Sequence, residues 1–202
     1  MSNLIITIIS IALVAVVALI GIWYGGGAFS NTSVTAQANT MIAQAEQISN
    51  AIRVLSLDNG GIQSYPGAIN CTLNGSALGN ALISGRYIQS IPGQSFHGDL
   101  CGGGPIYTPG RWAYMDGTGS CAGPIKILVT EFGNNSYLQT NCGYPTTDYR
   151  PVCNAINKLQ GVTTPPNDTS WVTLFSAMGN YNFICEENYS YPGLFYFLYR
   201  VF

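Results

Sequence analysis

The N-terminal stretch Leu4–Trp23 is the feature that most limits how this chain can fold. It is apolar throughout except for Thr7, Ser10 and Gly21. As a helix rising ~1.5 Å per residue it would be about 30 Å long, which matches the hydrocarbon core of a bilayer. The hydroxyls of Thr7 and Ser10 can bond back to the helix backbone, so they do not prevent a membrane span. The stretch therefore predicts an apolar helix of membrane length.

A run of three glycines follows this stretch: Gly25, Gly26 and Gly27. It is consistent with a cleavage site after Ala28, a loose linker, or a joint between two helices. A secretory signal normally begins with basic residues, and the first cationic side chain here is Arg53. Both flanks have helical patterns, and each glycine weakens a helix by ~1 kcal/mol relative to alanine. We therefore expect an unwound or extended joint within Tyr24–Ser30.

The next segment is amphipathic. Apolar residues recur at alternating spacings of four and three: Val34, Ala38, Met41, Ala45, Ile48, Ile52 and Leu55. This spacing predicts a helix with one buried face. Asn31, Thr32 or Ser33 can cap its start, and Asn59-Gly60-Gly61 supplies residues that readily end a helix.

From Ile62 onward the chain consists of short segments rich in Gly, Pro and Asn. Helices are predicted at Ser76–Ser84 and Pro151–Leu159. Strands are predicted at Pro105–Tyr107, Arg111–Met115, Ile125–Phe132 and Leu194–Phe202. The last of these is apolar on both faces and should be covered on both. We expect an α+β protein with four parts: an apolar helix at 1–24, a glycine joint at 25–30, an amphipathic helix at 31–58 and a disulfide-bonded head at 59–202.

All the cysteines lie C-terminal to the apolar stretch: Cys71, Cys101, Cys121, Cys142, Cys153 and Cys185. An even number on one side of a membrane-length helix indicates disulfides in an oxidising compartment, with buried reduced cysteines as the alternative. None of the spacings is typical of a metal site.

Composition and motifs favour no catalytic or nucleic-acid-binding role. Only 8% of residues are charged and the seven basic residues are scattered, so no basic surface for phosphates is predicted. The single histidine, His97, lies in a loop segment with Ser95 and Asp99, whereas catalytic triads converge from separate elements. Asp116 and Glu186-Glu187 are predicted to be turn residues. We expect no enzyme activity, no metal and no cofactor.

Six Asn-x-Ser/Thr sequons make the chain a candidate glycoprotein. They begin at Asn31, Asn70, Asn74, Asn134, Asn167 and Asn188.

The order of these parts resembles a type IV pilin. The resemblance is carried by the apolar helix, the amphipathic "TAQANTMIAQAEQISNAIRVLSLDNGG" and the cysteine-containing body. "CNAINKLQ", "SWVTLFSAMG" and a cysteine before a final hydrophobic strand are similar to the type IVb pilins of conjugative thin pili.

The resemblance implies a structural subunit that polymerises with copies of itself into an extracellular pilus (fimbrium), with cell adhesion, conjugation, motility and DNA uptake as alternative roles. The filament core would comprise Leu4, Ile5, Ile6, Ile8, Ile9, Leu13, Val16, Leu19, Ile20 and Trp23. Before assembly the subunit would lie in the inner or cytoplasmic membrane, where a prepilin peptidase and the pilus assembly machinery act on it. The resemblance also implies a disulfide between Cys153 and Cys185, and the pairing of the other four cysteines stays open.

The chain departs from the family pattern at its start. Pilins usually carry a glutamate near the beginning of the mature helix, and Ile5 stands at that place here. Minor pilins, type II secretion pseudopilins and archaeal pilins vary at this place and remain alternatives. No basic leader ending in glycine precedes the helix, so we expect a processed chain with a candidate methylated amine at Met1.

Two other protein classes fit part of the pattern. One is a single-span, membrane-anchored extracellular binding module that never polymerises. The other is a disulfide-rich secreted hydrolase whose N-terminal segment is removed after Ala28.

Overall fold

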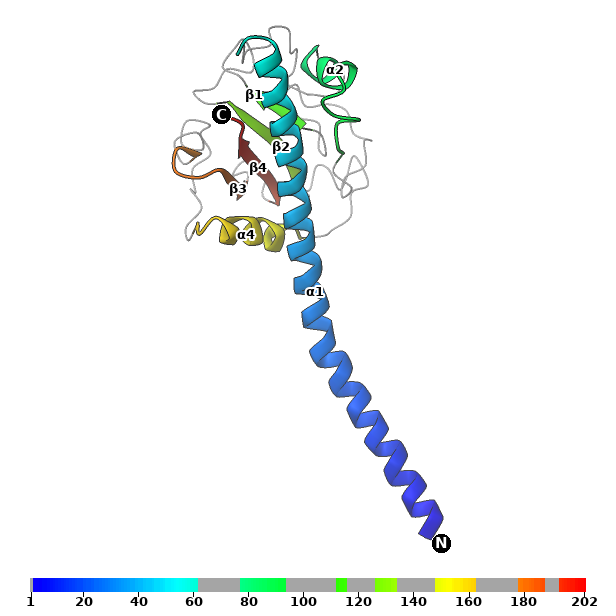
Figure 1. Ribbon diagram of the computed structural model, residues 1–202. Coiled ribbons are helices and arrows are strands. Elements are labelled where there is room, and N and C mark those ends of the chain that lie inside the picture. Colours follow the sequence, from blue (N-terminus) through cyan, green and yellow to red (C-terminus); the bar gives the residue numbers. More distant parts are fainter. Residues whose placement is uncertain are drawn as a thin grey trace, which may run out of the picture.

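The computed structural model describes residues 2–61, 77–93, 112–115, 126–133, 148–162, 178–187 and 193–202, with side chains of 5–23 and 30–61 in the first range. Figure 1 shows one long helix that runs past a small sheet and continues far beyond it. The helices are α1 (Ser2–Asp58), α2 (Ala77–Ser84) and α4 (Arg150–Leu159). The strands are β1 (Trp112–Met115), β2 (Ile127–Gly133), β3 (Phe183–Glu187) and β4 (Leu194–Arg200). The chain is therefore an α+β protein, as its sequence predicts.

Helix α1 is continuous through the three glycines, so the expected break within Tyr24–Ser30 is not found. Asn31, Thr32 and Ser33 lie inside the helix and do not cap a second one, and the Thr35 hydroxyl donates a hydrogen bond to the Asn31 carbonyl (2.9 Å). The physical reason is cooperativity. Ending a helix leaves backbone groups without partners and starting another needs a costly nucleus, which outweighs ~1 kcal/mol per glycine.

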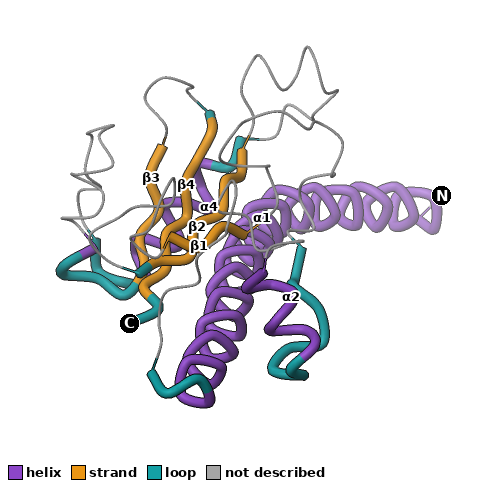
Figure 2. Tube along the Cα trace, turned by 90° about the horizontal axis from the view of Figure 1, so that it is seen from above, coloured by secondary structure: helices purple, strands orange, loops and turns teal. Residues whose placement is uncertain are grey.

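The helix is nevertheless not straight. Figures 1 and 2 together show that α1 bends near its middle, so that its N-terminal half points away from the head at an angle to the half beside the sheet. The three glycines, Gly25 to Gly27, also lie near the middle of α1. The two expected helices are thus a single bent helix.

The C-terminal end of α1 matches the prediction from Asn59-Gly60-Gly61. Gly60 and Gly61 adopt positive φ angles of 71° and 86°, a conformation that side-chain-bearing residues rarely adopt. The Gly61 amide donates to the Ser56 carbonyl at 2.7 Å, which satisfies part of the helix end. The Tyr87 hydroxyl, beyond α2, donates to the carboxylate of Asp58 at 2.5 Å and ties the end of α1 to the α2 segment.

The four described strands form one antiparallel sheet in the order β1-β2-β4-β3. β1, β2, β4, α2 and α4 lie where the sequence predicts a strand or helix. The prediction of a solvated turn at Glu186-Glu187 is wrong, because both residues belong to β3 and Glu186 is buried. Glutamate is rare in strands. Here both glutamates follow the apolar residues Phe183 to Cys185 and pair with β4, which places them in the sheet.

The sheet is covered on both faces. One face packs against α1 and α4, and the predicted helical stripe lies in this core: Ala38, Met41, Ala45, Ile48, Ile52 and Leu55 are buried, with Val34 partly buried at its edge. The other face carries a smaller apolar cluster: Met115, Ile127, Val129, Met178, Ile184 and Leu198. In β4, Phe197 contributes to the first face and Leu198 to the second, so this strand is covered on both sides as predicted.

Candidate functional site

The N-terminal half of α1 is an uncovered apolar surface. Ile5–Trp23 has a mean hydropathy of 3.1 and no part of it is buried against the rest of the chain. Its large apolar side chains are 52% to 85% exposed: Ile5, Ile6, Ile8, Ile9, Ile11, Leu13, Val14, Val16, Val17, Leu19, Ile20, Ile22 and Trp23. The segment is long and apolar enough to cross a membrane, a property that it shares with signal sequences.

The helix satisfies its polar groups internally in this half. The Ser10 hydroxyl donates to the carbonyl of Ile6 at 2.9 Å, as the sequence predicts. No Asp, Glu, Lys or Arg occurs between Ile5 and Trp23. An apolar environment can therefore surround this half without leaving a charge unpaired.

The other half of α1 is held firmly by the head. The Arg53 Nε donates to the carbonyl of Val201 at 2.5 Å, which links α1 to the C-terminal strand region. The Gln44 side-chain amide donates to the carbonyl of Gly93 at 3.3 Å, beyond α2. Together with the buried stripe, these contacts fix the direction in which α1 leaves the head.

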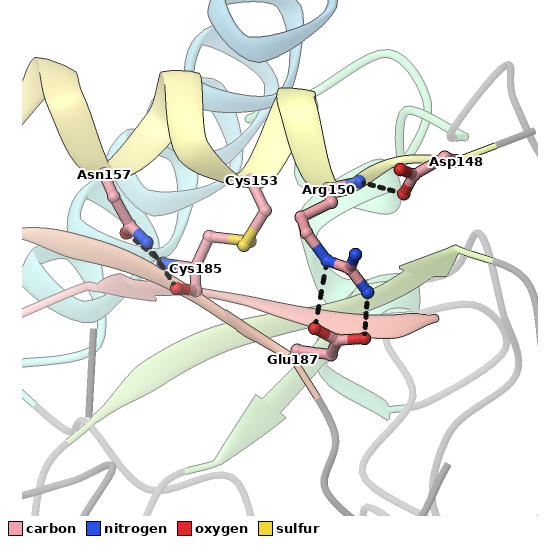
Figure 3. Close-up of a disulfide and its surroundings, with 6 residues drawn as sticks. All are labelled: Asp148, Arg150, Cys153, Asn157, Cys185 and Glu187. Carbon is pink, nitrogen blue, oxygen red and sulfur yellow. Dashed lines mark hydrogen bonds and ion pairs between the residues drawn. A yellow bond between two sulfur atoms is a disulfide. The ribbon is translucent and has the colours of Figure 1, made fainter. Parts of the chain in front are cut away.

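A clamp between α4 and β3 stabilises the head (Figure 3). Cys153 on α4 and Cys185 on β3 form a disulfide, with Cα atoms 5.3 Å apart, as the family resemblance implies. The bond closes a loop across 32 residues. A disulfide of this kind stabilises a fold by roughly 2–4 kcal/mol, mainly because it restricts the unfolded chain.

Asn157 adds a second connection one turn along α4. Its side-chain oxygen accepts from the Cys185 amide at 2.8 Å, and its side-chain nitrogen donates to the Cys185 carbonyl at 2.7 Å. Asn157 is only 3% exposed, so both ends of its amide are satisfied within the protein. The sequence gives no sign of this role, because an asparagine within a helix does not indicate which distant strand it will contact.

Arg150 supplies a third connection, at the solvent-facing end of the clamp. Its guanidinium contacts both carboxylate oxygens of Glu187, at 3.0 and 3.3 Å. The Gly193 amide donates to the same carboxylate at 2.8 Å. The hydrogen bond from Arg150 lowers the pKa of Glu187, so this carboxylate stays ionised and paired at neutral pH.

A buried carboxyl group lies on the opposite face of the sheet. Glu131 on β2 is 7% exposed and is paired in register with Tyr196 on β4. Burial raises the pKa of Glu131 to about 7, and a hydrogen bond from Tyr196 opposes this shift. On β3, the strand on the other side of β4, Glu186 is also paired in register with Tyr196. Glu131 is therefore a candidate for pH-dependent stability.

Several predicted site residues lie outside the described residues. They are Met1, the side chain of Leu4, Cys71, Cys101, Cys121, Cys142, Asn70, Asn74, Asn134, Asn167, Asn188, Ser95, His97, Asp99, Asp116 and the strand at Pro105–Tyr107. Asn31, whose sequon is described, is exposed on α1. Within the described ranges no group of three or more His, Cys, Asp or Glu residues is placed to hold a metal ion.

Comparison of this chain with models of known protein families, with curated protein sequences and with solved structures finds no match.

Proposed function

We propose that this protein is a structural subunit that polymerises, through the N-terminal half of α1, into an extracellular filament like a type IV pilus. One observation carries the proposal. A 19-residue apolar segment, Ile5–Trp23, is wholly uncovered, and it continues without a loop into the helix that forms the core of the head. In water such a surface can be buried only by other molecules, and further copies of the same helix provide matching surface.

The absence of charged side chains from the N-terminal half of α1 favours transfer from membrane to filament. The first 45 residues contain no Asp, Glu, Lys or Arg. Basic residues normally hold a membrane helix at the cytoplasmic headgroups, and none stands beside this one. Extraction would therefore move no charged side chain of these 45 residues through the bilayer. Lipid tails are as apolar as these side chains, so the exchange of lipid for neighbouring helices depends on packing.

The continuity of α1 favours a regular polymer over a tethered binding module. A module on a membrane anchor commonly needs a flexible connection, whereas here one helix joins the apolar half to the core of the head. Each head then keeps one orientation relative to its own apolar half. Identical subunits with fixed geometry can repeat the same contact along a helical assembly.

The test compares assembly with membrane insertion. Ala12, Ala15 and Ala18 are exposed in the apolar half, and changing all three to Leu keeps the segment apolar but adds volume. The matched control changes Ala36 and Ala43, exposed alanines beside the head, to Leu. We expect both variants to fractionate with membranes. Negative-stain microscopy after detergent removal should show filaments for the unchanged chain and the control, and few or none for the triple variant.

Two outcomes would contradict the proposal. If the unchanged chain gives only dispersed particles in every condition while it remains in membranes, it is an anchored module. If the triple variant forms the same filaments as the control, the apolar half of α1 is not the packing surface.

A further inference from the structure

Strand β3 lies at one edge of the sheet, because it follows β4 in the order β1-β2-β4-β3 and pairs with no other described strand. In an antiparallel pair, the backbone N–H and C=O groups of one residue point toward the partner strand, and those of the next residue point away from it. Both backbone groups of Cys185 bond to Asn157, so they point away from β4. The alternation places the backbone groups of Phe183 and Glu187 on the same outward side.

The Asn157 side chain takes the place that a neighbouring strand would occupy. A side-chain amide has one donor and one acceptor group, like a peptide unit, and here both are used on one residue of β3 at 2.7 and 2.8 Å. Exposed strand edges are templates for pairing with other chains, and proteins commonly cover them. α4 lies across β3 in Figure 3, with Arg150, Cys153 and Asn157 directed at the strand.

The β3 edge is self-complementary. If two copies pair antiparallel about Cys185, Phe183 of one copy lies opposite Glu187 of the other, and Ile184 lies opposite Glu186. No glutamate then faces a glutamate, which avoids the repulsion of like charges placed directly across a sheet. The same strand on both sides also satisfies the symmetry of a two-fold interface.

We propose that α4 is a cover on the β3 edge, held by Asn157 and the Cys153–Cys185 disulfide, and that without this cover β3 pairs with β3 of a second copy. The site is separate from the apolar half of α1 and does not depend on the proposed filament. In the covered state Asn157 occupies both outward backbone groups of Cys185, so the middle of the β3 edge is closed to a second copy.

The test uses the full chain in mild detergent with residue-resolved amide hydrogen exchange. The release variant combines Asn157→Ala with Cys153→Ser and Cys185→Ser. The control is Asn154→Ala, which changes an exposed asparagine about one turn before Asn157 on α4. At low protein concentration we expect the amides of residues 183, 185 and 187 to exchange about tenfold faster or more in the release variant, with residues 127–133 of β2 still protected. At high concentration protection should return, as a second copy covers the edge.

Each result decides the proposal. Exchange at residues 183, 185 and 187 that stays slow at low concentration means that α4 does not cover the edge. Fast exchange at both concentrations means that the edge does not pair with a second copy. If β2 loses protection as well, Asn157→Ala with the disulfide intact replaces the release variant. Faster exchange at Cys185 then supports the cover, and unchanged exchange there overturns it.

Discussion

The two halves of α1 are both rich in apolar residues, yet only one of them packs against the chain to which it belongs. In the half beside the sheet, apolar residues follow a stripe and their burial follows the same stripe, with Ile48 and Ile52 fully buried and Leu57, off the stripe, 75% exposed. In the N-terminal half apolar residues occur on every side and none is buried. A striped helix needs one partner surface, whereas a helix that is apolar all round needs to be surrounded.

This difference shows where the stability of each half originates. The half beside the sheet belongs to the core of the head and gains its stability within one chain. The N-terminal half gains nothing from its own chain beyond its helical hydrogen bonds, so its stability depends on a bilayer, a detergent or other copies. The following predictions test this contrast, from the largest expected effect to the smallest.

The same substitution in the two halves should have very different effects. Leu55 is 5% exposed and Leu13 is 62% exposed. Leu55→Ala removes buried volume and should lower the free energy of unfolding of the head by about 2–5 kcal/mol. Leu13→Ala should change it by less than about 0.5 kcal/mol. Urea unfolding in mild detergent, followed by near-ultraviolet circular dichroism, measures both. Equal losses would mean that the N-terminal half is covered within the single chain.

Dependence of stability on pH should be confined to the head, because Ile5–Trp23 has no ionisable side chain. The pKa of Glu131 is about 7 in the folded chain, against an ordinary value of 4.5. Between these values the folded state keeps its proton and the unfolded state loses it, so stability falls as pH rises from 4.5 to 7. Above pH 7 both states are ionised and the loss, about 3 kcal/mol, is complete.

Glu131→Gln should remove this decline, and urea unfolding at pH 5 and pH 8 measures it. Glu187→Gln is the control. The lowered pKa of Glu187 makes its contribution fall away only as pH drops below the ordinary glutamate range, so the decline between pH 4.5 and 7 should remain. A decline of the same size in Glu131→Gln would show that another group causes it.

The smallest effect concerns the junction of the two halves. Gly26→Ala should stabilise the helix locally by about 1 kcal/mol, because alanine loses less backbone freedom than glycine. Amide exchange of residues 24–30 in detergent should slow accordingly. Gly21→Ala, at a position with open space around it, should slow exchange near residue 21 and leave 24–30 unchanged. Unaltered exchange in Gly26→Ala would mean that the glycines do not limit the stability of the junction.

Local patterns were sufficient for much of the fold. The 4-3 spacing from Val34 to Leu55 identified the buried face, and Gly60-Gly61 identified the end of α1. β-branched and aromatic residues identified β1, β2 and β4. These predictions succeed because periodicity and turn chemistry act over a few neighbouring residues.

Other features depended on residues far apart in the sequence. β3 was missed because Glu186 and Glu187 resemble a turn, and pairing with β4 overrides that preference. The bonds from Asn157 to Cys185 and the burial of Glu131 depend on how strands and α4 meet. The break expected at Gly25 to Gly27 was wrong because low helix propensity at three residues does not outweigh the helices on both sides.

The sequence by itself determined that this chain has an apolar helix of membrane length, followed by a striped helix and an α+β head, because these properties follow from local composition and spacing. Only the tertiary structure decided that the two helices are one, that Asn157 on α4 bonds the backbone of Cys185 on β3, and which carboxyl groups are buried. Each of these results from contacts between distant segments, whose free energies outweigh the local preferences of the residues involved.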